Sequence, residues 1–254
     1  MNPIRLRDFT TARVALGRVG DSLPTQELLA FQLAHARARD AVHAQLDSAS
    51  LALELTQKGW ECAVVRSAAR DRAEYLRRPD LGRRLAENVS LAPGNYDACV
   101  VVADGLSALA IERHAVPLLD AFLPALIQAD WKIVPLLIAT QARVAIGDAI
   151  GVLLGAKMSV VLIGERPGLS SPDSLGVYLT WDPKPGRTDA ERNCLSNIRQ
   201  EGLSYELAAH KLLYLMTEAR RRRISGVTLK EEAAALLGPV LSKPSAGSTL
   251  PKIG

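Results

Sequence analysis

The sequence has few aromatic residues and few cysteines. Aromatic side chains make up only 4% of the 254 residues, so platforms for stacking nucleic-acid bases are scarce and the core must be built from Leu, Val, Ile and Ala. The three cysteines, Cys62, Cys99 and Cys194, form no CxxC pair, which argues against a zinc site or a disulfide framework. Three widely spaced thiols are typical of a protein of the reducing cytoplasm.

Long apolar runs are also absent. No stretch approaches the ~20 residues that a membrane helix requires, and the most apolar stretch, 133–139, has the length of a strand. Residues 1–9 are charged and lack the apolar segment of a secretory signal. These absences predict a soluble, cytoplasmic protein without a membrane partner.

The charge of the chain is not concentrated in one segment. The net charge is +4 and the pI is about 9.1, but the arginines are scattered, whereas nucleic-acid binding needs one basic face. We therefore expect no nucleic-acid partner. Hydrophobic residues make up 48% of the chain, so it can bury the core of one large domain or two small ones.

From residue 96 onward, short β-branched runs alternate with helical segments. Strands are expected at 99–103, 132–139, 158–163 and 176–181. Helices are expected after residue 105 up to about 129, and at 146–154, 192–198 and 203–222. The first of these helices should be divided in two by Pro117 and Pro124. This alternation predicts an α/β fold with a Rossmann-like, mainly parallel sheet flanked by helices.

The preceding region is expected to be mainly helical. An arm without clear periodicity leads to Pro24, and Thr25 can cap a helix that reaches about Leu46. A short strand at 61–66 and a short helix beginning at Gly82 are expected to follow. A Pro-Gly-Asn breaker at 93–95 indicates the boundary. We therefore divide the chain into an N-terminal arm and helical region, a Rossmann-like domain, and a tail expected to be disordered: 1–92, 93–238 and 239–254.

The carboxyl ends of the expected strands indicate where a ligand would bind. In parallel α/β sheets, ligands lie at that edge, and three segments fall there: 104–107, 140–144 and 164–168. Asp104 and Ser107 are more simply interpreted as turn and helix-cap residues. Glu165 and Arg166 fit a ligand-binding turn and a solvated surface turn equally well.

No catalytic set can be assembled from the sequence. A nucleophilic cysteine needs a nearby histidine or cation, and nothing pairs Cys194 with one, so a buried or ligand-lining thiol is favoured. His35 and His43 are two helical turns apart, too far to chelate one metal. Neither GxGxxG nor GxxxxGK[ST] occurs. The chain is therefore expected to bind a cofactor for chemistry located elsewhere.

Seven segments of the chain carry a family pattern. They are FTTARVALGRVG (9–20), PTQELLAF (24–31), HARARD (35–40), RPDLGRR (78–84), VADGLS (102–107), GAK through IGERPGL (155–169) and CLSNI (194–198). Each segment alone is only a modest signal of the family. Together, in this order, they resemble the small subunit of ethanolamine ammonia-lyase over residues 9 to about 225.

The resemblance implies a two-subunit enzyme that converts ethanolamine to acetaldehyde and ammonia. The large subunit would carry a TIM-type barrel and the substrate residues, and several large–small pairs would form a hetero-oligomer. The small subunit would have a helical N-terminal region at the subunit interface and a Rossmann-like domain facing adenosylcobalamin. Homolysis of the cobalt–carbon bond would supply the radical chemistry, with the protein binding and shielding the cofactor.

By the same resemblance, three residues of this chain would contact the cofactor: Val144, Glu165 and Cys194. An apolar Val and a carboxylate that accepts corrin amide N–H groups suit such contacts. No residue of this chain is expected to be catalytic or to bind the metal. The motif Asp-x-His-x-x-Gly is absent, which predicts base-on binding with no histidine from this chain on cobalt.

Two alternative functions stay open from the sequence. A self-sufficient nucleotide-dependent enzyme would bind NAD or ATP as an isolated chain, although the glycine motifs are missing. A non-catalytic assembly or reactivation partner would bind the large subunit yet be dispensable for turnover. Leaders of relatives serve solubility or targeting to a bacterial microcompartment, and the short leader here leaves that location open.

Overall fold

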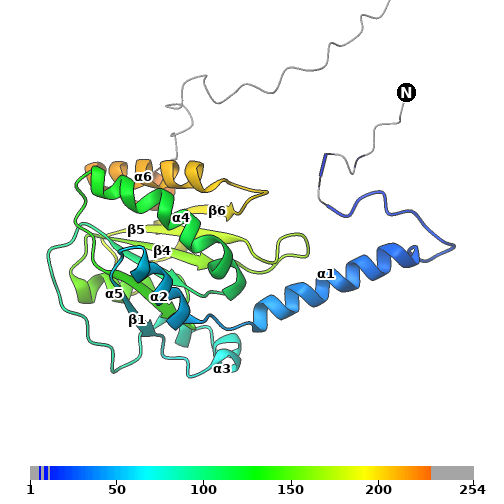
Figure 1. Cartoon of the computed structure of the whole chain (residues 1–254), viewed down its shortest axis with the longest axis horizontal. Coiled ribbons are helices and arrows are strands. Elements are labelled where there is room, and N and C mark those ends of the chain that lie inside the picture. Colours follow the sequence, from blue (N-terminus) through cyan, green and yellow to red (C-terminus); the bar gives the residue numbers. More distant parts are fainter. Residues whose placement is uncertain (1–5, 7–8, 11, 230–254) are drawn as a thin grey trace, which may run out of the picture.

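The fold is built on one six-stranded sheet (Figure 1). The computed structural model describes residues 6, 9–10 and 12–229. The strands are β1 (Cys62–Arg66), β2 (Cys99–Ala103), β3 (Leu136–Thr140), β4 (Met158–Gly164), β5 (Leu175–Trp181) and β6 (Asn193–Ile198). The helices are α1 (Thr25–His43), α2 (Ser48–Gln57), α3 (Arg72–Arg77), α4 (Ala108–Gln128), α5 (Ile146–Leu154) and α6 (Tyr205–Arg222). Short 3₁₀ turns lie at Leu81–Arg83, Asp189–Glu191 and Gly226–Thr228.

The sheet is mainly parallel and is covered on both faces. Its order is β1-β3-β2-β4-β5-β6: β1, β3, β2 and β4 run parallel, β5 runs antiparallel to β4, and β6 runs antiparallel to β5. Val100 and Val102 join a core with α2, α4 and α6, whereas Val101 and Ala103 join a second core with α5. Because successive strand side chains point to opposite faces, the fully buried run of β2 serves both cores. The predicted α/β fold is confirmed.

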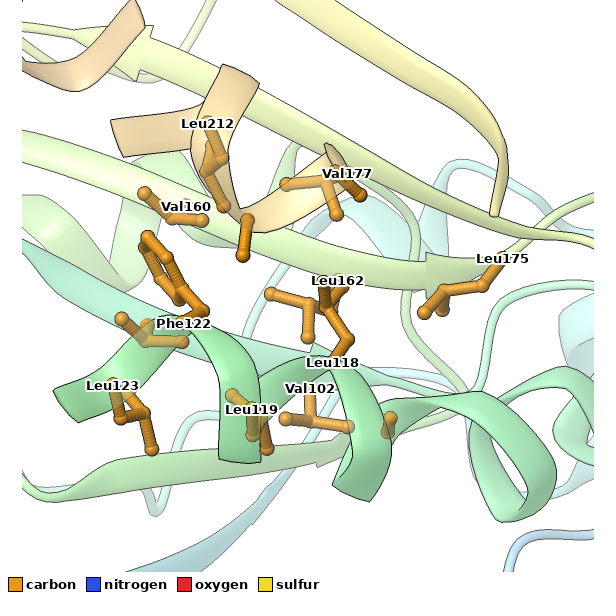
Figure 2. Packing of buried hydrophobic residues seen from close by; sticks show 14 of the residues in the cluster. Val102, Leu118, Leu119, Phe122, Leu123, Val160, Leu162, Leu175, Val177 and Leu212 are labelled. Atoms are coloured by element: carbon orange, nitrogen blue, oxygen red, sulfur yellow. The ribbon is translucent and has the colours of Figure 1, made fainter. Parts of the chain in front are cut away.

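Helix α4 is continuous, contrary to the prediction of two pieces. Pro117 and Pro124 both lie inside it, although proline removes a helical hydrogen bond and costs ~3 kcal/mol in a helix interior. The compensation is packing: Leu118, Leu119 and Phe122 are fully buried and point toward the strands, with α6 alongside (Figure 2).

Residues 193–198 form a strand rather than the expected helix. Leu175 pairs with Ile198 and Val177 with Leu195, so the three residues 175–177 of β5 lie opposite the four residues 195–198 of β6. This bulge lets Leu195 and Ile198 face the same core despite a spacing of three. That spacing imitates one face of a helix, which explains the wrong prediction.

The N-terminal region contributes to the sheet. Strand β1, expected from the sequence, precedes the predicted division near residue 93 and forms the edge of the sheet beside β3. Helix α1 ends at His43, and α2 follows as a separate helix. Helix α3 was not expected. The predicted tail at 239–254 lies outside the described residues, and no described helix is long and apolar enough to cross a membrane.

Candidate functional site

A cleft of ≈ 1170 Å³ opens on the α5 face of the sheet. Four parts of the chain line it: residues 79–85, the β3–α5 connection with α5, the end of β4 with Tyr178 of β5, and the segment 185–192. The cleft thus includes two of the strand ends at which a ligand was expected. Its volume exceeds the ~300–1,000 Å³ usual for small-molecule pockets, so it suits a large ligand.

One wall of the cleft is apolar. Ala149, Val152 and Leu153 lie on one side of α5 and line the cleft together with Ala145, which directly precedes the helix. Val152 and Leu153 are exposed, although large apolar side chains are normally buried. Val144 precedes this helix and also lines the cleft. The wall can therefore receive the flat, apolar part of a ligand.

The rest of the lining is strongly basic. The lining holds no lysine or glutamate. It holds six arginines and two aspartates, which are Arg83, Arg84, Arg143, Arg166, Arg187, Arg192, Asp148 and Asp189. Clefts lined by one sign of charge concentrate ligands of the opposite sign. The lining therefore favours a ligand that combines apolar surface with negative charge.

A buried ion pair in the lining of this cleft joins Asp148 of α5 to Arg192, the residue directly before β6. The Arg192 guanidinium donates to both Asp148 carboxylate oxygens, at 2.8 and 2.6 Å. It also donates to the Thr180 hydroxyl at 2.8 Å and the Arg187 carbonyl at 3.0 Å. Both charged side chains are at most 2% exposed. The bidentate geometry fixes the position of the cleft wall.

The loop that carries Val144 is held by Asp104. The Asp104 carboxylate accepts the backbone N–H groups of Gln141 and Ala142 at 2.8 and 2.9 Å. Burial is the main influence on Asp104 and raises its pKa, against the lowering effect of these N–H groups. Ser107 caps α4 by accepting the Ala110 N–H. Asp104 and Ser107 are thus structural turn residues, as the simpler interpretation predicted.

Glu165 lies directly after β4, and its carboxylate is held across the start of β5. It accepts the Ser174 hydroxyl, and the Asn197 N–H at 3.3 Å. A Cβ atom at Gly176 would lie 2.9 Å from Glu165 Oε1. Glycine at this position therefore leaves the space that the carboxylate occupies.

Cys194 pairs with Tyr178 across the β5–β6 ladder, and their side chains are hydrogen-bonded. Cys194 is an exposed residue, but partial burial of its thiol raises the pKa of that thiol, the Tyr178 hydroxyl lowers it, and the Glu165 carboxylate raises it again. Burial likewise raises the pKa of Tyr178. A thiol with a raised pKa is a poor nucleophile at neutral pH, which disfavours a catalytic role for Cys194.

The three predicted contact residues lie in or beside the cleft. Val144 lines the cleft together with Tyr178, and Tyr178 interacts with both Glu165 and Cys194. Glu165 and Cys194 themselves stand beside the cleft rather than in its lining. Sequence reasoning missed Arg143, Tyr178 and Arg192. Arg143 adjoins Val144 in a segment that was indicated, whereas nothing in a single sequence signals the other two.

Comparisons with known proteins identify the family of the chain. Residues 2–230 match the family model for the ethanolamine ammonia-lyase light chain (EutC). The chain belongs to that family. It is 58% identical over 237 residues to the ethanolamine ammonia-lyase small subunit of Azotobacter vinelandii, covering 90% of this chain and 88% of the relative. It is 55% identical over 262 residues to that of Pseudomonas syringae pv. tomato, covering 100% and 91%.

Membership of the EutC family confirms the resemblance predicted from the seven segments. The chain is a small-subunit component of a lyase. The family's names also imply a large subunit as partner and ethanolamine as substrate of the complex.

Proposed function

We propose that this chain forms one wall of an adenosylcobalamin site, with the large subunit supplying the residues that act on ethanolamine. The supporting observation is the cleft, in which an apolar helix face adjoins an arginine-rich rim. When bound, the cofactor supplies the radical chemistry that no side chain provides.

The residues in and beside the cleft fit the chemistry of a corrin. Corrin rims carry amide groups, and the Glu165 carboxylate is an acceptor fixed by Ser174 and Asn197. Val144 and the apolar side of α5 provide contact for the macrocycle, and Cys194 adds a neutral thiol beside Tyr178. These residues would bind and orient the cofactor and exclude water from it.

We further propose that the cofactor is bound base-on. The four histidines lie away from the cleft: His35 and His43 belong to α1, His210 to α6, and His114 is bonded to Tyr205 at 2.9 Å. None of them is part of the cleft lining. The cofactor's own benzimidazole then remains on cobalt. Nitrogen coupling from isotope-labelled histidine in the EPR spectrum of Co(II) would contradict this.

The first test is reconstitution of the complex. We expect acetaldehyde formation from ethanolamine only when this chain, its large subunit and adenosylcobalamin are all present. In the same complex, Glu165→Ala and Val144→Ala should weaken cofactor binding, measured by absorbance titration. The matched control is Glu206→Ala, an exposed carboxylate in the first turn of α6.

Each other result has a distinct meaning. A stable complex that turns over without this chain would identify an assembly or reactivation partner. Binding of NAD or ATP by the isolated chain, without complex formation, would support the nucleotide-dependent alternative. We also propose an assembly of several large–small pairs in the cytoplasm or a microcompartment, which the mass of the purified complex and its cellular fractionation would test.

We propose that α1 binds the large subunit. Figure 1 shows α1 extending away from the sheet, and only Ala41 of its 19 residues is buried. Four large apolar side chains of this helix are exposed: Leu28, Leu29, Phe31 and Leu33. Helices in proteins owe most of their stability to packing of an apolar face, so this surface needs a partner.

Replacing Leu29 and Leu33 together by serine should disrupt the complex. The two residues are one helical turn apart, and each is more than half exposed in this chain, so its own core is left intact. Burial of each leucine contributes about 1.5–3 kcal/mol, which predicts at least ~100-fold weaker association in pull-down titrations. Deleting residues 1–24 should also abolish co-purification.

The control is Leu53→Ser, an equally exposed leucine on α2. It should leave association unchanged. Retained association of both the Leu29/Leu33 double variant and the truncated chain would rule out α1 as an interface.

A further inference from the structure

Arg143 is held by an aromatic ring inside the cleft wall. Its guanidinium carbon lies 4.6 Å from the centroid of the buried Tyr75 ring. The Tyr75 hydroxyl donates to the Ala142 carbonyl at 3.1 Å, and the Arg143 N–H donates to the Gly82 carbonyl at 2.7 Å. Stacking and hydrogen bonding thus fix both the side chain and the backbone of Arg143. Its guanidinium is preorganised before any ligand arrives.

The charges around Tyr75 do not balance. Arg72 also stacks on the ring, at 4.8 Å, so two cations share one aromatic residue. The nearby carboxylate is Asp104, 3.6 Å from Arg72. Burial lowers the pKa of Arg72, Asp104 opposes this, and the cation of Arg143 lowers it further. An anion bound at Arg143 would relieve this repulsion between like charges.

Arg143 also has unused hydrogen-bonding capacity. The guanidinium lines the cleft, and it forms no hydrogen bond or ion pair with another side chain in the described part of the chain; its buried Nε atom also lacks a partner. Arg83 and Arg166 line the same cleft, and neither forms an ion pair with a carboxylate in the described part of the chain. By contrast, Arg84, Arg187 and Arg192 are each paired with one.

We infer that Arg143, assisted by Arg83 and Arg166, forms a subsite for a phosphodiester. The inference rests on the proposed cobalamin function, because the cofactor's nucleotide loop carries one such group. Guanidinium N–H groups match the oxygens of a phosphate and form charge-assisted hydrogen bonds with them. The apolar side of α5 would then face the corrin while the arginine rim receives the nucleotide loop.

The test compares two probes on the purified large–small complex. Cyanocobalamin carries the nucleotide loop and its phosphate, whereas cyanocobinamide has the same corrin without them. Arg143→Met should weaken cyanocobalamin binding about 10- to 100-fold in absorbance titrations. The same variant should change cyanocobinamide binding by less than about threefold. Arg143→Lys keeps the charge but loses the planar fork, so it should give an intermediate loss on cyanocobalamin only.

Arg222→Met provides the control for net charge, because Arg222 is an exposed residue in the last turn of α6. It should leave both affinities unchanged. Equal losses for both probes, or none for cyanocobalamin, would overturn the phosphodiester subsite. If Arg143→Met prevents assembly, Arg143→Lys carries the same probe comparison. A wild-type complex that binds neither probe would instead refute the cobalamin function itself.

Discussion

Asp148→Asn is expected to destabilise the α5 wall of the cleft by about 3–5 kcal/mol, the usual cost of removing one partner from a buried ion pair. The variant keeps the size of the side chain but removes its charge. Arg192 then retains its bonds to Thr180 and the Arg187 carbonyl but has no buried counter-charge. Because its side chain is only 1% exposed, water cannot compensate.

Hydrogen exchange in the purified complex would measure this loss. Amides of α5 and β6 should exchange at least ~100-fold faster in the variant, since each 1.4 kcal/mol corresponds to a factor of ten. Lys58 and Asp120 form the matched surface pair, at 2.8 Å, and Asp120→Asn should change exchange by less than about tenfold.

A double variant separates the charge effect from packing. Asp148→Leu combined with Arg192→Met replaces both partners with apolar side chains, which is often neutral where a single removal is not. It should therefore be more stable than Asp148→Asn. If the double variant is worse than the single one, the pair contributes through its hydrogen bonds rather than through charge balance.

Gly105→Ala is expected to cost about 2–5 kcal/mol, because it combines a left-handed backbone with overpacking. Gly105 has a φ of 58°, and an added Cβ would lie 2.2 Å from the Gly164 carbonyl oxygen. The Leu106 N–H donates to that same oxygen at 2.9 Å. The turn after β2 and the end of β4 are therefore in backbone contact, and neither can move away without breaking this bond.

Gly59→Ala is the matched control for this variant. Gly59 also has a positive φ, 88°, but an added Cβ there would meet nothing within 4 Å. It should cost only the backbone term of about 1–2 kcal/mol. Yield of the assembled complex and hydrogen exchange over β2 and β4 would measure both variants. Equal effects would show that steric contact with Gly164 is unimportant.

The parts of the fold that the sequence predicted are those with a strong local signal. The β-branched runs of β2 and β4 are buried on both faces, so composition alone identifies them. The two prolines of α4 gave a misleading signal. The rule that proline breaks a helix is local and does not include the packing that offsets the cost of the prolines. In β6, a bulge placed Leu195 and Ile198 on one face with a helical spacing.

The site was predicted only in part, for a similar reason. The edge rule for parallel sheets and the family resemblance together indicated Val144 and Glu165. The pairing of Asp148 with Arg192 joins residues 44 positions apart, and the stacking of Arg143 on Tyr75 joins residues 68 positions apart. Such contacts depend on how the strands are ordered, and a single sequence carries no pattern for that.

The residues that line the cleft come from distant parts of the sequence, and this links ligand binding to folding of the chain. Its lining comes from positions between 79 and 192, so it exists only after β3, β4 and β5 have assembled through contacts distant in sequence, which form slowly. A ligand that binds only the completed cleft stabilises the native state by mass action, by about 2.7 kcal/mol at one hundred times its dissociation constant. If the proposed cofactor is that ligand, its supply influences how much of this subunit persists in the cell as well as how fast its complex turns over.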